Sequence, residues 1–132
     1  MLRITLRDGE KAIINGAVIR ASGRVQIAIE NQVTVLRGRE VMKPEEATTP
    51  ARQLYFATML AYIDPAGREA YQDNVVELIA HLVNALPGEA AHAACVRFAA
   101  EAGLGDFYRA LSSARELIAF EDLAAGRTEL AA

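Results

Sequence analysis

Residues Met42 to Pro65 read MKPEEATTPARQLYFATMLAYIDP, and this stretch separates a strand-rich part of the chain from a helical part. Thr49 can cap a helix, because its hydroxyl can accept a hydrogen bond from an amide of the first turn. Pro50 suits the first helical position, where its missing N–H is not needed. The stretch therefore predicts a helix that begins at Pro50.

The expected helix is apolar on all sides. From Leu54 to Ile63 every residue except Thr58 is apolar or aromatic, and a helix of this kind must be covered all round. Asp64 precedes a proline and is pushed out of the helical region, which ends the helix. We expect a central helix over 50–63 on which both parts of the chain pack.

Before this helix the chain shows the alternation of short strands. Leu2, Ile4 and Leu6 alternate with polar residues, which indicates a strand with one buried face. Asp8-Gly9 predicts a hairpin with a returning strand over 11–15. Further short strands are expected over 17–20, 24–30 and 33–36, followed by an extended piece over 39–42.

After residue 43 the pattern is helical. Helices are expected over 50–63, about 68–86, 89–102, and from about 106 to a stop at Gly126. The second carries an apolar stripe, made of Val75, Leu78, Ile79, Leu82, Val83 and Leu86. Gly103 suits the left-handed position that follows a helix, and the tail over 127–132 is expected to fray.

The expected fold class is α+β, with a small N-terminal antiparallel β module followed by a C-terminal bundle of about four helices. The β module spans 1–43 and the helical module 44–132, as one compact unit that shares the helix 50–63. A thin β module leaves strand edges open to pairing with another chain. A homodimer through the β module is therefore one expectation.

The two modules differ in charge. Residues 1–43 carry eight basic and four acidic side chains, a net charge of +4, whereas residues 44–132 carry six basic and thirteen acidic ones. A basic module can meet a polyanion such as RNA, or the two modules can simply attract each other or a second copy. The candidate RNA-binding residues are Arg3, Arg7, Lys11, Arg20, Arg24, Arg37 and Arg39.

Arginine suits phosphate because its planar fork donates two hydrogen bonds at once. Residues 1–43 contain no aromatic side chain, although readers of single-stranded RNA usually stack bases on aromatics. Any RNA contact would thus use charge, backbone groups and arginine stacking. The alternative is that these arginines form an ordinary solvated sheet face.

A second candidate surface lies on the central helix. Tyr55, Met59 and Tyr62 share one helical face, which indicates either a partner surface or core packing. Arg52 lies in the first turn, where the helix dipole disfavours a cation. Its position predicts a fixed carboxylate or phosphate partner.

The sequence gives no support for an enzyme, a metal or a cofactor. His81 and His92 lie on different expected helices, without an HExxH or CxxC motif. Cys95 is the single cysteine and lies in an apolar stripe, which favours an inert thiol in a reducing compartment. The early charges and the lack of a long apolar run at the N-terminus indicate that no secretory signal is to be expected, and no segment is apolar for about 20 residues. We expect a cytoplasmic binding protein that contacts no membrane.

The central block TPARQLYFATMLAYIDP, preceded by VMKPEEA, resembles the FlbT family of flagellin-mRNA regulators. The segments GEKAIINGAVI and VTVLRGREVM are also similar to that family, and the resemblance extends from about Leu2 to Ile118. It implies a post-transcriptional regulator that binds the 5′ untranslated region of flagellin mRNA and modulates its translation and decay. It also implies a small partner protein, FlaF, and either repression or activation in different members.

Two functions follow. In the first, the basic β module binds RNA directly, with an affinity that falls steeply with salt. In the second, the helical module is an adaptor or chaperone for flagellin or FlaF and acts on mRNA only indirectly. The missing aromatics of the β module favour the second function, and its positive charge and the family resemblance favour the first.

Overall fold

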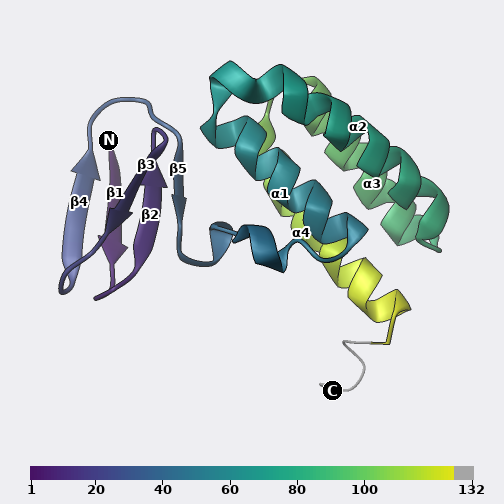
Figure 1. Ribbon diagram of the computed structural model, residues 1–132, viewed down its shortest axis with the longest axis horizontal. Helices are drawn as coiled ribbons and strands as arrows, with labels where there is room; N and C mark the ends of the chain where they lie inside the picture. Colours follow the sequence, from purple (N-terminus) through teal and green to yellow (C-terminus); the bar gives the residue numbers. More distant parts are fainter. Residues whose placement is uncertain (127–132) are drawn as a thin grey trace. The chain divides into compact units, whose positions relative to one another are not determined.

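The computed structural model describes residues 1–126 and divides into two compact units, Met1–Val41 and Met42–Ala132 (Figure 1). Unit 1 is made of antiparallel strands and unit 2 of helices. The predicted α+β class is therefore confirmed. The tail over 127–132 lies outside the described residues.

Unit 1 contains two small antiparallel sheets. Its strands are β1 (Leu2–Leu6), β2 (Lys11–Ile14), β3 (Ala17–Arg20), β4 (Val25–Ile29) and β5 (Val35–Arg37). One sheet has the order β1-β4 and the other the order β3-β2-β5. The core between them is built by alternate residues, with Ile4 and Leu6 of β1 packed with Ala12 of β2 and with Ala21. The period of two holds in β1 and β4, whereas β2 buries the consecutive residues Ala12 and Ile13 and β3 is exposed throughout.

The Asp8-Gly9 turn does not form the expected hairpin, because β1 pairs with β4 and not with β2. The Gly9 amide donates to the Ala21 carbonyl at 2.8 Å, and the Gly23 amide donates to Asp8 Oδ1 at 2.7 Å. These two hydrogen bonds link the turn at residues 8–9 to the turn at residues 21–23. The chain therefore passes at Asp8 from the β1-β4 sheet to the β3-β2-β5 sheet. The β2–β3 hairpin turns at Asn15-Gly16, where both residues have positive φ.

The expected extended piece over 39–42 is also wrong in its first part, because Gly38–Glu40 forms the 3₁₀ helix η1. Gly38 has a φ of 55°, which favours glycine, and the Glu40 carboxylate accepts a hydrogen bond from the Arg37 amide at 3.2 Å. This local bond turns the chain directly after β5.

Unit 2 contains four α-helices within residues 42–126, as expected. They are α1 (Pro50–Ile63), α2 (Arg68–Ala85), α3 (Glu89–Gly103) and α4 (Phe107–Ala124), with short 3₁₀ helices η2 (Pro44–Glu46) and η3 (Pro65–Gly67). Helix α1 packs against α2 and α4, and α3 packs against α4 (Figure 1). Short connections make sequential helices neighbours in a small bundle.

The ends of α1 follow the predicted capping. Thr49 Oγ1 accepts a hydrogen bond from the Arg52 amide at 3.3 Å, and the helix ends before Asp64. The prediction for Gly103 is wrong, because this residue completes α3 and Gly105 takes the positive φ of 79°.

The core of unit 2 is formed by large side chains from all four helices, namely the fully buried Leu54, Leu82, Phe98 and Leu117. The apolar stripe expected on α2 is only partly buried. Val75 and Leu82 lie inside, whereas Val83 is 39% exposed. No helix within residues 1–126 has the length and apolar character needed to cross a membrane.

Candidate nucleic-acid interface

Four of the predicted RNA-binding arginines line one depression on unit 1. Arg3 lies on β1 and Arg7 follows that strand, while Arg24 precedes β4 and Arg37 ends β5. All four residues are exposed. Thr5 and Asp8 complete the lining.

The strand register explains why these side chains share a face. In the β1–β4 sheet Arg3 is opposite Ala28, and Thr5 is opposite Gln26. All four of these residues are exposed. The alternate positions supply the core, so the outer face carries only arginine, small and neutral polar side chains.

Arg7 and Arg24 directly flank the last pair of the ladder, Leu6 with Val25. Like charges on facing strand positions are destabilising. The four guanidinium groups of the depression form no ion pair with any carboxylate in residues 1–126. Asp8 also lines the depression, and its carboxylate, whose Oδ1 accepts the Gly23 amide, offsets part of this positive charge. A bound anion would relieve the repulsion between the arginines.

Hydrogen bonds between distant segments shape this surface. Arg37 Nη1 donates to the Thr5 carbonyl at 3.4 Å, which brings the end of β5 to the β1–β4 sheet. The bond from the Gly23 amide to Asp8 sets Arg24 beside the end of β1. The arginines therefore sit on a hydrogen-bonded frame. Sequence reasoning missed Thr5 and Asp8 as lining residues of the depression, because their place beside the arginines depends on strand pairing and on the bond to Gly23.

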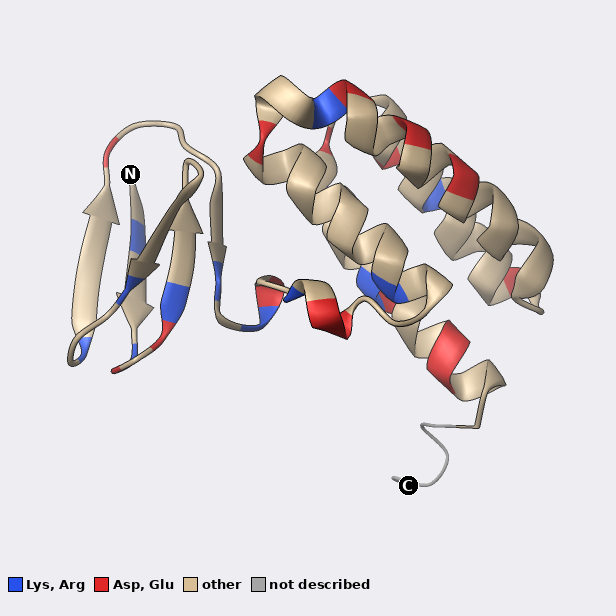
Figure 2. Ribbon diagram, viewed as in Figure 1, with Lys and Arg blue, Asp and Glu red and all other residues tan. Residues whose placement is uncertain are grey.

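The other three predicted residues lie outside the depression. Lys11 and Arg20 are opposite each other in the β2–β3 hairpin, and Arg39 lies in η1. All three are exposed. Figure 2 shows Lys and Arg distributed over the strands of unit 1 and Asp and Glu along α2 of unit 2. Of the seven predicted residues, the depression thus gathers Arg3, Arg7, Arg24 and Arg37.

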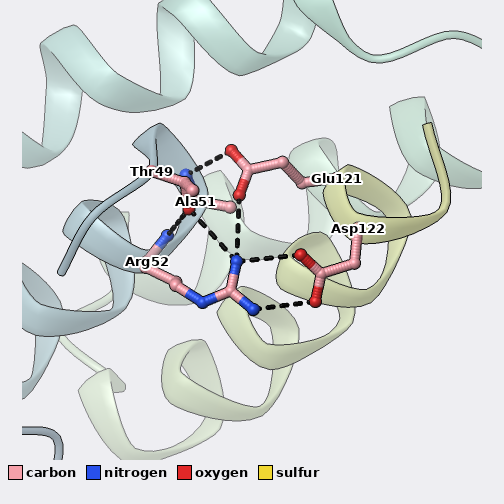
Figure 3. A network of polar contacts seen from close by, with 5 residues as sticks. All are labelled: Thr49, Ala51, Arg52, Glu121 and Asp122. Atoms are coloured by element: carbon pink, nitrogen blue, oxygen red, sulfur yellow. Dashed lines mark hydrogen bonds and ion pairs between the residues drawn. The ribbon is translucent and has the colours of Figure 1, made fainter. Parts of the chain in front are cut away.

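On unit 2, Arg52 has the fixed carboxylate partner that its position predicted (Figure 3). Its Nη1 and Nη2 donate to the two oxygens of Asp122 at 2.8 Å each, and Nη1 lies 3.6 Å from Glu121 Oε1. The hydrogen bond to Asp122 is the main cause that raises the pKa of Arg52 above its usual value. Glu121 Oε2 also accepts the Ala51 amide at 2.9 Å. The network ties the start of α1 to the end of α4.

The other residues of the predicted partner surface differ in exposure. Tyr55 and Met59 are buried, as the core-packing alternative expects. Arg115 Nη2 donates to the Tyr55 hydroxyl at 3.0 Å. Tyr62 is half-buried and its ring centroid lies 5.5 Å from that of Tyr108 on α4. Of these three residues, Tyr62 is therefore the one that is accessible to a partner protein.

Two findings concern the metal-ligating and nucleophilic side chains of the described residues. Residues 1–126 contain no group of three or more His, Cys, Asp or Glu side chains placed to hold a metal ion. Cys95 is buried, and burial raises the pKa of its thiol, which keeps it in the unreactive protonated form.

The family model described as flagellar protein FlbT matches residues 2–124, a span that includes the arginine depression and the Arg52 network. The chain belongs to the FlbT family. A FlbT relative from Caulobacter vibrioides, named a probable flagellum biosynthesis repressor, is 30% identical over 92% of this chain and 86% of its own length.

Two further FlbT relatives carry the same name. The one from Agrobacterium fabrum is 36% identical over 92% of this chain and 81% of its own length. The one from Rhizobium leguminosarum is 38% identical over the same shares. No solved structure matches the chain. The FlbT family is described by a role in flagellum biosynthesis, not by a catalytic activity.

Proposed function

We propose that this FlbT-family protein is a post-transcriptional repressor of flagellin synthesis. It binds the 5′ untranslated region of flagellin mRNA in the cytoplasm and thereby modulates translation and decay of the message. The sign follows the relatives, which are named repressors of flagellum biosynthesis. The observation that carries the proposal is the depression lined by four exposed arginines whose guanidinium groups form no ion pair within residues 1–126.

The chemistry of this surface fits RNA phosphates. A guanidinium binds a phosphate through two parallel charge-assisted hydrogen bonds. Each phosphate that an arginine neutralises releases counterions, so the affinity gains a strongly salt-dependent part. Repression follows if the bound protein competes with ribosome access to the leader.

The test is the affinity of the purified protein for a flagellin 5′ leader RNA, measured by fluorescence anisotropy over a salt series. The Arg7→Ala, Arg24→Ala double variant should lose affinity by about 10-fold or more, because two phosphate contacts disappear. The slope of log affinity against log salt should become shallower by about 0.7 to 0.9 for each arginine removed.

A matched control removes the same charge from unit 2. Arg97 and Arg109 are exposed and form surface ion pairs with Glu116 and Asp106, so the Arg97→Ala, Arg109→Ala variant should keep the wild-type affinity and slope. Equal losses in the two variants would show that net charge, and not the arginine depression, governs binding. Absence of wild-type binding at low salt would contradict direct RNA binding.

One observation favours an adaptor function for flagellin or FlaF as the second candidate. On unit 2, Leu104 is 86% exposed and Tyr108 is 46% exposed, and Tyr108 contacts Tyr62. Aromatic side chains are enriched at the centres of protein interfaces, and the exposed Leu104 adds apolar surface beside Tyr108. Pull-down of purified flagellin or FlaF that Leu104→Ser, Tyr108→Ser abolishes, without any RNA binding, would favour this function.

A homodimer through unit 1 also stays a prediction. Within residues 1–126, β3 pairs only with β2 and is an edge strand, and all four of its residues are exposed. Such an edge can accept a strand of another chain. A monomeric mass in solution at all concentrations tested would exclude the dimer.

A further inference from the structure

We infer that the arginine depression recognises base-paired RNA, so that a stem and not an unpaired segment is the element bound. The inference rests on the proposed function and names the form of RNA that the site takes. It follows from the rigidity, the spacing and the side-chain composition of the β1–β4 face.

The face is a fixed platform. Arg3 on β1 and Arg7, which directly follows β1, are four residues apart, a distance of about 13 Å for an extended backbone. Arg24 is held beside the end of β1 through the bond from Gly23 to Asp8, and Arg37 is held by its bond to the Thr5 carbonyl. The backbone positions that carry the arginines are therefore set by strand pairing and by these hydrogen bonds.

A duplex matches such a platform better than a single strand does. At the charge spacing of double-stranded DNA, about 13 Å of axis carries about eight phosphate charges over both strands, twice the number on one strand. Its phosphates are also held by base pairing, so less conformational entropy is lost on binding. Four arginines therefore gain more binding free energy from the dense, preorganised phosphates of a duplex than from those of a single strand.

An unpaired RNA strand loses more conformational entropy on binding, and this face has no aromatic side chains on which its bases could stack. Stacking of bases on aromatic side chains contributes about 1 to 3 kcal/mol per base in single-strand binding proteins. The exposed positions of the β1–β4 ladder between the arginines hold Thr5, Gln26 and Ala28 instead. A hydroxyl and an amide can both hydrogen-bond to a 2′-hydroxyl, which A-form RNA displays in its shallow minor groove.

The experiment compares two RNAs of equal length and base composition, one a hairpin with a stem of about 16 base pairs and one permuted so that it cannot pair. Full-length protein is titrated against each by fluorescence anisotropy at about 50 mM and 200 mM salt. We expect the hairpin to bind at least about 10-fold more tightly than the permuted RNA. In the Arg7→Ala, Arg24→Ala variant the ratio of hairpin affinity to permuted-RNA affinity should fall towards one. In the Arg97→Ala, Arg109→Ala variant this ratio should stay at the wild-type value.

The outcomes separate the inference from the proposed function. Equal or tighter binding of the permuted RNA, lost in Arg7→Ala, Arg24→Ala, would overturn the inference and leave RNA binding by the depression in place. A hairpin preference that survives in that variant would also overturn it, because another surface would then select the stem. Binding of neither RNA would reject both the inference and the proposed function.

Discussion

At the residue scale, Arg52 shows how one side chain joins distant parts of unit 2. Its guanidinium pairs with Asp122 and Glu121, whose side chains are 18% and 12% exposed. Arg52→Met would leave two poorly solvated carboxylates without their cation, and a hydrogen bond to a charged group is worth about 1.5 to 3 kcal/mol. We expect a loss of about 2 kcal/mol in the free energy of unfolding, measured by urea denaturation followed by circular dichroism.

The control is Arg109→Met. Arg109 is 77% exposed and lies 3.5 Å from Asp106, so its removal should change the free energy of unfolding by less than about 1 kcal/mol. The double variant Arg52→Met, Asp122→Asn should lose less than the two single losses added, because both remove the same interaction. Additive losses would contradict the pairing.

The sequence could predict that Arg52 has an anionic partner, but it could not predict which residue supplies the carboxylate. A cation in the first turn of a helix indicates a nearby anion. Asp122 lies 70 residues further along the chain, and only the packing of α4 on α1 brings it close. In the same way the charge of Arg3, Arg7 and Arg24 was visible in the sequence, whereas their gathering depends on strand register.

At the scale of elements, the start of α1 depends on the Thr49 cap. Its Oγ1 accepts the Arg52 amide at 3.3 Å, and replacing a threonine cap by alanine costs about 1 kcal/mol. Thr49→Ala should therefore lower the midpoint of thermal unfolding, whereas Thr49→Ser should retain most of the wild-type stability. The neighbouring exposed Thr48 is the matched site, and a Thr48→Ala variant as unstable as Thr49→Ala would contradict the capping role.

Helix boundaries were more predictable than strand pairing for a physical reason. Caps and prolines act within a few residues, so α1 begins and ends where Thr49 and Asp64 place it. The pairing of β1 with β4 joins segments separated by two other strands. Alternation predicts that a strand has a buried face but not which partner it takes. The Asp8-Gly9 turn therefore gave a plausible hairpin that the fold does not use.

At the scale of the whole molecule, charge and fold class divide at the same place. Residues 1–41 carry seven basic and four acidic side chains, whereas residues 42–132 carry seven basic and thirteen acidic ones, and Figure 2 shows acidic residues along the helices of unit 2. If RNA binds unit 1 and a flagellar protein binds unit 2, one chain can link the two events. Such coupling requires each ligand to change the affinity of the other by the same factor.

The two units should differ in their ability to fold alone. Unit 2 has its own buried core, including Leu54, Phe98 and Leu117. The ion pair between Arg52 and Asp122 links the first and last helices around this core. Unit 1 comprises Met1–Val41, and chains near about 40 residues rarely bury enough surface to be stable without staples.

We therefore expect the fragment 42–132 to give a helical circular dichroism spectrum and a cooperative thermal transition, and the fragment 1–41 to give neither. The helical fragment should also have no measurable affinity for the flagellin leader, because the arginine depression is missing. Tight RNA binding by the folded fragment 42–132 would move the RNA-binding surface to unit 2. An unfolded fragment 42–132 would instead show that the helical core alone is insufficient and that unit 1 contributes to the stability of the whole chain.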